Sequence, residues 1–149
     1  MRAVCQRVKW ARVSVDGVPV GAIGLGWAVL LGVGRGDDEA TAAALVDQLV
    51  HVRAFDDGSG RMALAAGDVA AEFLVVSQIT LHADLSKGRR PSFTKAAPPE
   101  RARVLVDNFA EMLRQQGFRV TTGQFGATMD VELCNEGPVT IVLATDGWG

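Results

Sequence analysis

The sequence contains few of the residues that most often build metal or redox sites. Of its 149 residues, only two are cysteine and two are histidine. Cys5, Cys134, His51 and His82 show none of the paired spacings that zinc sites use. The two cysteines lie far apart in strand-like segments, so we expect two buried thiols rather than a disulfide. We expect no bound metal and no cofactor.

Long hydrophobic runs are also absent. Glycines and charges interrupt every apolar stretch before it reaches the roughly 20 residues of a transmembrane helix. The start of the chain, residues 1–7, has no apolar segment behind a basic one, as a secretory signal would. We therefore expect a cytoplasmic protein with no membrane contact. The hydrophobic content of 48% argues against disorder, and the length suits a single domain over residues 1–149.

The formal net charge of −2 gives no reason to expect nucleic-acid binding by the chain as a whole. The basic residues are nevertheless clustered. Arg2, Arg7, Lys9 and Arg12 precede the first acidic residue, and residues 87–95 contain four basic residues and no acid. Each cluster alone is typical of a solvated surface, but two such patches suit a local contact with a polyanion.

Hydrophobic periodicity predicts an α/β domain with a mixed sheet. The order is three strands, a helix, a strand, a second helix and three strands. The ranges are a strand at 3–10, a hairpin at 12–23, a buried strand at 27–33, a helix at about 38–55, a strand at 72–76, a helix from 98–100 to Gly117, a strand at 118–121, and two strands within 131–143. We expect residues 3–10 to alternate regularly between the two faces of the sheet.

Gly137-Pro138 separates the last two apolar runs. Because proline has no backbone N–H and breaks a β ladder, this step predicts a sharp turn between two strands. A cis peptide costs little before proline, and glycine removes the clash of a Cβ atom. Such a turn can direct two consecutive carbonyl oxygens one way, where an ammonium group binds. An ordinary Gly-Pro hairpin is the alternative.

The side chains offer little conventional catalytic chemistry. The glycines at 32, 34 and 36 do not have the dinucleotide-binding spacing, and the acids at 37–39 would repel a phosphate. Ser77 or Thr80 with His82 is the one local candidate for a nucleophile and its base, and no Gly-x-Ser-x-Gly motif surrounds either. The residues alone therefore predict a ligand-binding loop set without a defined reaction.

Several motifs together resemble the D-aminoacyl-tRNA deacylases. Ser77-Gln78-Ile79-Thr80-Leu81 is similar to the family's Ser-Gln-Phe-Thr-Leu motif, and residues 135–140 are similar to its Asn-x-Gly-Pro-Val-Thr motif. The resemblance continues, in order, through residues 1–8, 87–94, 96–99 and 123–129. Each motif alone is weak, but together they cover nearly the whole chain.

The resemblance implies a sheet curled toward a barrel, two main helices and a homodimer. Gly137-Pro138 would be a cis dipeptide inserted into the partner subunit. Its carbonyl oxygens would hold the α-amino group of the substrate and exclude an L side chain. The implied reaction is hydrolysis of the ester of D-aminoacyl-tRNA, and of glycine mischarged on a non-cognate tRNA.

The resemblance also implies roles for single residues. The proposed catalytic set is Ser77, Gln78 and Thr80, around an ester whose hydrolysis is assisted by the tRNA's own ribose hydroxyl. The proposed substrate-binding set is Gly137, Pro138, Ile79, Phe125, Met129 and Asn135. The proposed contacts to the tRNA acceptor end are Arg7, Lys87, Arg89 and Arg90. Ile79 departs from the usual phenylalanine, which would weaken stacking on a base by about 1 kcal/mol.

Two alternatives remain at this point. The first alternative to a deacylase is a dimeric tRNA-binding module without turnover. The second is an esterase that uses a Ser/Thr–His pair.

Overall fold

Strand β1 (Arg2–Val15) organises the sheet in the computed structural model, which describes residues 1–147. It pairs antiparallel with β2 (Val18–Ile23) and β3 (Gly26–Gly32) along one edge, and with β8 (Asp130–Ala144) along the other. Asp16 and Gly17 both have positive φ, of 51° and 76°, in the tight turn from β1 to β2. The predicted first hairpin is therefore confirmed.

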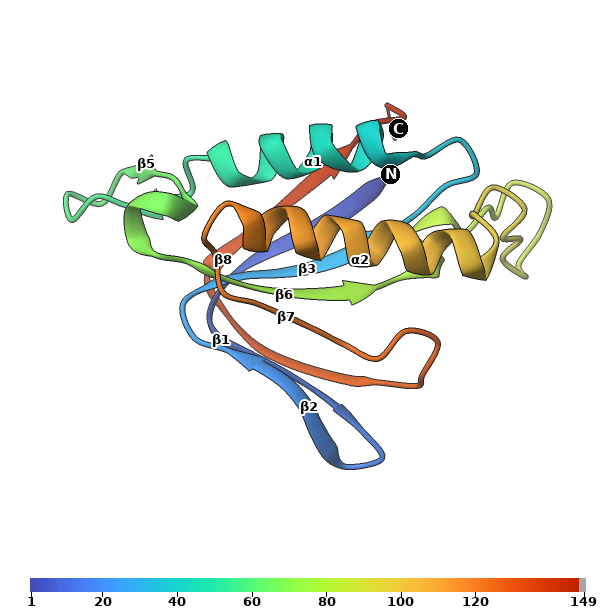
Figure 1. Ribbon diagram of the computed structural model, residues 1–149, viewed down its shortest axis with the longest axis horizontal. Coiled ribbons are helices and arrows are strands. Elements are labelled where there is room, and N and C mark those ends of the chain that lie inside the picture. Colours follow the sequence, from blue (N-terminus) through green and yellow to red (C-terminus); the bar gives the residue numbers. More distant parts are fainter. Residues whose placement is uncertain (148–149) are drawn as a thin grey trace.

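The sheet continues from β3 to strands that run parallel to it. β6 (Glu72–Ser77) pairs with β3, and β7 (Val120–Thr122) pairs with β6. Helices α1 (Glu39–His51) and α2 (Pro99–Gln115) lie side by side over one face of this sheet (Figure 1). No helix within residues 1–147 is long and apolar enough to span a membrane. The smaller elements are β4 (Phe55–Asp56), β5 (Met62–Leu64), and the 3-10 turns η1 (Ala66–Val69) and η2 (Ile79–His82).

The helix ends follow local sequence signals, with one correction. Asp38 caps α1 by accepting a hydrogen bond from the backbone N–H of Thr41 at 2.9 Å. At its other end α1 stops at His51, four residues before the predicted end, because Val52 is already extended. Phe55 belongs instead to β4, where its ring meets the Trp27 ring edge-on at 5.4 Å. Tertiary packing here overrides the continuing helical pattern.

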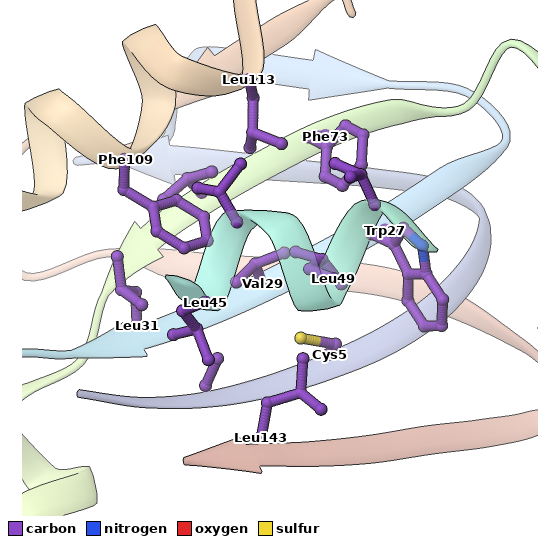
Figure 2. Close-up of a cluster of buried hydrophobic side chains, with 14 of the residues drawn as sticks. Cys5, Trp27, Val29, Leu31, Leu45, Leu49, Phe73, Phe109, Leu113 and Leu143 are labelled. Carbon is purple, nitrogen blue, oxygen red and sulfur yellow. The ribbon is translucent and has the colours of Figure 1, made fainter. Parts of the chain in front are cut away.

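The main hydrophobic core fills the space between the two helices and the sheet. Figure 2 shows Leu45 and Leu49 of α1 and Phe109 and Leu113 of α2 in one cluster with side chains of the sheet, among them Trp27 of β3. A second, smaller cluster lies on the other side of the sheet, consistent with a sheet curled toward a barrel; it contains Val8, Ala11, Val13, Ile23, Ala28, Leu74 and Val76. Burial raises the pKa of the Cys5 thiol to about 12, so this thiol stays protonated.

Strand β8 is one continuous strand, so the predicted turn at Gly137-Pro138 is wrong. Residues 130–135 and 140–144 both pair antiparallel with β1, and residues 136–139 leave the ladder between them. The segment is thus a bulge, which bends a strand without reversing it. No strand within residues 1–147 covers the outer edge of β8, and an edge position tolerates Pro138.

The bulge in β8 has a counterpart in β1. The register between the strands shifts between Gln6 and Val8, and again between Val8 and Trp10. Arg7 and Val8 are consequently both buried. The regular alternation predicted for residues 3–10 breaks at this point, because a bulge changes which face each following side chain occupies.

Gly26 offers a test of the parallel pairing. A Cβ atom at Gly26 would lie 1.8 Å from the backbone oxygen of Glu72. We expect Gly26→Ala to lower the free energy of unfolding by about 3 kcal/mol or more, because β3 and β6 must separate. The control is Gly36→Ala, where nothing lies within 4 Å, and it should change stability by less than about 1 kcal/mol. Urea denaturation followed by tryptophan fluorescence measures both, and equal effects would contradict the prediction.

Candidate active site

A mostly apolar cavity lies at the carboxyl end of β6. It has a volume of about 420 Å³ and is closed by the start of α2 and the loop between β7 and β8. Its wall is formed by Leu31, Val33, Val76, Ser77, Gln78, Ile79, Ala97, Pro99, Ala102, Val106, Phe125, Gly126, Ala127, Met129 and Val131. Five residues predicted from the sequence therefore meet here: Ser77, Gln78, Ile79, Phe125 and Met129. We call this space the main cavity.

The main cavity is mostly apolar, with polar groups at one end. Ser77 is also part of the wall of a smaller neighbouring space of about 150 Å³, together with Asp107 and Thr122. Arg103 of α2 lies 5.0 Å from the centre of the Phe125 ring and holds it from outside the main cavity. Arg103 could not be singled out from the sequence, because its ring partner Phe125 lies on a distant loop. An apolar slot with a few polar atoms suits a flat organic group such as a nucleobase.

The turn after β6 presents a small set of hydrogen-bonding groups. The side-chain amide of Gln78 donates to the Thr80 hydroxyl, and the backbone N–H of Gln78 donates to the Leu31 carbonyl at 2.8 Å. The N–H groups of Ile79 and Thr80 begin η2, and neither has an acceptor among the described residues. These two amides are the donors available to a ligand. Thr80 itself is exposed and is not part of the main cavity wall.

His82 is placed away from the main cavity. It is 4% exposed and is part of the wall of a different cavity, beside Gly34. Burial lowers the pKa of His82, and the positive charges of Arg2 and of the N-terminal amino group lower it further. No hydrogen bond joins His82 to Ser77 or Thr80 in the described part of the chain. The arrangement therefore does not support the Ser/Thr–His esterase.

Within residues 1–147, no group of three or more His, Cys, Asp or Glu side chains is placed to hold a metal ion.

The Gly137–Pro138 peptide bond is cis, as the resemblance implied. Gly137 has a φ of +132°, which favours glycine, and a Cβ atom there would lie 2.8 Å from a methyl group of Val139. Both residues are exposed. The carbonyl oxygens of Gly137 and Pro138 belong to the bulge that leaves the ladder. They are therefore free to accept hydrogen bonds from a ligand.

Asn135 was predicted to bind substrate, but its side chain is bonded within the bulge. Its Oδ1 accepts a hydrogen bond from the backbone N–H of Val139 at 2.7 Å, and its Nδ2 donates to the Thr140 hydroxyl at 2.9 Å. These bonds span the Gly-Pro step from one side to the other. Asn135 therefore fixes the shape of the bulge.

Arg7 holds the same bulge through hydrogen bonds of its guanidinium group. It is 6% exposed; its Nε donates to the Glu136 carbonyl at 3.0 Å, and its Nη1 donates to the Ala54 carbonyl at 2.7 Å. The carboxylate of Asp56 lies 3.6 Å away. The prediction that Arg7 contacts the tRNA acceptor end does not fit this chain, because the guanidinium is buried and already bonded. The sequence placed Arg7 on the surface because it did not reveal the bulge in β1.

The other predicted tRNA contacts lie on a folded surface loop, residues 84–95. Asp84 and Ser92 exchange two backbone hydrogen bonds, of 2.8 and 2.9 Å, which close the loop. Lys87, Arg89 and Arg90 are exposed, and none forms an ion pair with another described residue. The loop lies next to the start of α2 (Figure 1). It therefore presents three unpaired cations near the main cavity.

Arg7 provides a test of how the bulge is held. Arg7→Met keeps the apolar stem and leaves the carbonyls of Ala54 and Glu136 without a donor, so we expect a loss of about 2–4 kcal/mol in the free energy of unfolding. The control is Arg12→Met, which breaks the exposed Arg12–Glu132 ion pair of 2.8 Å and should change stability much less, because solvent screens an exposed pair. Chemical denaturation compares them. A loss at Arg7 no larger than at Arg12 would show that the buried bonds do not support the fold.

The chain is similar to known proteins over nearly its whole length. A family model described as D-Tyr-tRNA(Tyr) deacylase matches residues 4–144. The D-aminoacyl-tRNA deacylase of Thermomicrobium roseum is 56% identical over 143 residues, covering 96% of this chain and 93% of that protein. The corresponding protein of Heliobacterium modesticaldum is 52% identical over 147 residues, covering 99% and 98%.

Two solved structures share the fold. One, of a c-Myc DNA Unwinding Element Binding Protein, is 38% identical with a TM-score of 0.91, covering 97% of this chain and 99% of that chain. The other, of a probable eukaryotic D-amino acid tRNA deacylase, is 20% identical with a TM-score of 0.82, covering 95% and 97%. The family match over nearly the whole chain and the relatives at more than half identity lead to one conclusion: the chain belongs to the D-Tyr-tRNA(Tyr) deacylase family, whose members are hydrolases of the aminoacyl-tRNA ester bond.

Proposed function

We propose that the protein hydrolyses the ester bond of D-aminoacyl-tRNAs and releases free tRNA and the D-amino acid. Glycine mischarged on a non-cognate tRNA is a second substrate. The observation that carries this proposal is the exposed cis Gly137–Pro138 bulge, with its two carbonyl oxygens outside the β ladder, on a chain of the deacylase family.

Carbonyl oxygens of the main chain distinguish the D from the L enantiomer of the substrate. The carbonyl groups of Gly137 and Pro138 accept hydrogen bonds from the α-ammonium group of the substrate, and hydrogen bonds to a charged group are the stronger kind. With the ammonium group and the ester both fixed, only one direction remains for the side chain. An L side chain points into the protein and is excluded, whereas a D side chain points away. Glycine has no side chain and is accepted.

The complete site requires two subunits. The bulge at residues 136–139 contributes nothing to the main cavity wall of its own chain. In a homodimer, each subunit inserts its bulge into the partner's main cavity and completes both sites. The uncovered edge of β8 supports this arrangement, as do the exposed apolar side chains of Val142 on β8 and Ile79 at the mouth of the cavity, which are 55% and 52% exposed.

Hydrolysis proceeds by positioning rather than by a catalytic base on the protein. The terminal adenosine occupies the main cavity against Phe125, Met129 and Ile79. Ser77, Gln78 and Thr80 hold the ester, and the N–H groups of Ile79 and Thr80 stabilise the developing oxyanion. A ribose hydroxyl of the tRNA assists the attack of water. The position of His82 in another cavity supports this chemistry over a Ser/Thr–His pair.

The tRNA is the partner in the cytoplasm, and its acceptor end lies along the loop 84–95. Lys87, Arg89 and Arg90 attract its phosphates without reading bases. We therefore expect affinity for tRNA to fall as the salt concentration rises.

The deciding assay compares the two enantiomers of one substrate. We expect the protein to release D-tyrosine from D-tyrosyl-tRNA about 100-fold faster or more than L-tyrosine from L-tyrosyl-tRNA, because the L side chain has no room beside the fixed ammonium group. Spontaneous hydrolysis without protein is the control. Equal cleavage of both esters would contradict the proposal. Binding without release of either amino acid would instead favour the tRNA-binding module without turnover.

Mixed dimers test the cross-subunit site. Gly137→Val distorts the bulge, and Gln78→Ala removes a side chain from the main cavity wall, so we expect each homodimer to lose about 100-fold in rate. Refolding the two variants together forms dimers in which one site combines an intact bulge with an intact cavity. Random pairing should then restore about a quarter of wild-type activity. If activity stays at the level of the separate variants, each site lies within one chain.

A further inference from the structure

A second cavity lies on the far side of a narrow backbone partition from the main cavity. It has a volume of about 560 Å³ and lies between the start of β1, the loop before α1, and the end of the loop 84–95. Gly34 and Lys95 are part of its wall, whereas Val33 and Ala97 are part of the wall of the main cavity. Adjacent or nearly adjacent residues of the chain thus contribute to the walls of two different cavities.

The partition is held by main-chain bonds. Gly34 and Ala96 form an isolated β-bridge. The N–H of Ala97 donates to the Val33 carbonyl, and the N–H of Arg35 donates to the Lys95 carbonyl, both at 3.0 Å. The relative position of the two cavities is therefore fixed by backbone. A ligand long enough to cross this partition would occupy both.

The charges in the second cavity favour an anionic group. Its two carboxylates are already bonded: Asp37 accepts from the Met1 ammonium group and from the Gly34 N–H, and Asp146 accepts from Arg2. Arg35 and Lys95 add two exposed positive charges. Lys95 has only a 3.6 Å contact with Asp84. The local excess of positive charge continues directly into the cationic loop 84–95.

One buried polar atom at this cavity also lacks a partner. His82 is 4% exposed and forms part of the wall, and its Nε2 has no hydrogen bond among the described residues. The unpartnered nitrogen is suited to a hydroxyl donor, and a ribose supplies a hydroxyl next to each phosphate of an RNA strand.

We propose that the second cavity binds a ribose–phosphate unit of the RNA strand whose terminal nucleoside occupies the main cavity. This inference rests on the proposed function and extends it to the nucleotides before the terminal adenosine. Arg35 and Lys95 bind the phosphate, and the polar wall beside His82 binds the ribose. The strand crosses the Gly34–Ala96 partition between the two sites.

Equilibrium binding of uncharged RNA tests the proposal. The probe is a 5′-labelled hairpin with a single-stranded CCA end, followed by fluorescence anisotropy on the full-length protein. We expect Arg35→Gln to weaken binding about 3- to 10-fold. The fall of log K with the logarithm of the salt concentration should become less steep by about 0.7, the value for one phosphate contact of a single strand. The matched control is Arg61→Gln, which removes the same charge from the turn between β4 and β5 at the opposite end of the molecule (Figure 1). It should leave affinity unchanged.

Three further arms locate the contact. Arg35→Gln should leave binding of a blunt hairpin without the CCA end unchanged; an equal loss with both RNAs overturns the proposal. Replacing both cytidines of the CCA end by 2′-deoxycytidines should weaken binding to the wild type; no change overturns the ribose part. Hydrolysis of a D-aminoacyl-adenosine, which lacks the earlier nucleotides, should be unchanged in Arg35→Gln.

These arms also separate this inference from the proposed function. Binding of uncharged RNA does not depend on turnover. If the wild type cleaves no ester but Arg35→Gln still weakens binding only to the CCA-ended hairpin, the proposed function fails and the second cavity remains an RNA site. If the wild type cleaves D-aminoacyl-tRNA and Arg35→Gln binds like Arg61→Gln, the second-cavity proposal alone fails.

Discussion

The buried guanidinium of Arg7 is the interaction on which the candidate site depends. It donates to the Glu136 carbonyl, immediately before the Gly-Pro step, and to the Ala54 carbonyl after α1. The bulge in β8 is thereby tied to a segment outside the sheet. Asn135 closes the same bulge from its outer side. With both ends held, the carbonyl oxygens of Gly137 and Pro138 have fixed directions, which recognition by main-chain atoms requires.

In the proposed function, the bulge and the main cavity of one chain do not meet, so a monomer would be incomplete as an enzyme. The main cavity offers an apolar slot, and the turn after β6 offers two unpaired amides, whereas the exposed carbonyls of the bulge are acceptors for an ammonium ion. Joining them across a dimer places both kinds of group around one ester. Subunit association would then set the catalytic geometry. The affinity of the dimer and the catalytic rate would be linked through the same bulge.

The sequence predicted which residues form the candidate site better than it predicted how the backbone arranges them. Ser77, Gln78, Ile79, Phe125 and Met129 were assigned to one site because the motifs resemble a family, and all five are part of the main cavity wall. The turn at Gly137-Pro138 was predicted wrongly, because proline signals a break in a strand but not its direction. Only the pairing of both halves of β8 with β1 shows a bulge. The burial of Arg7 follows from that same strand pairing, which cannot be read from a local sequence pattern. The end of α1 was predicted too late in the chain, because the Phe55 ring packs against the Trp27 ring instead of continuing the helix.

In the proposed site, the carbonyl groups that select the enantiomer and the cavity residues that hold the nucleoside and the ester lie on different parts of the chain. Substitutions in these two parts should therefore have different effects. Under the proposed function, residues that only shape the main cavity, such as Ile79, would alter stacking by about 1 kcal/mol, or roughly fivefold in affinity. Residues that set the direction of the bulge, such as Arg7 and Gly137, would act on the position of the substrate, where a displacement of about 1 Å costs on the order of 100-fold in rate. Substitutions in the cavity wall would therefore change the selectivity between enantiomers little. Substitutions that move the carbonyl groups of the bulge would change it most, because these groups would fix the direction of the substrate's side chain.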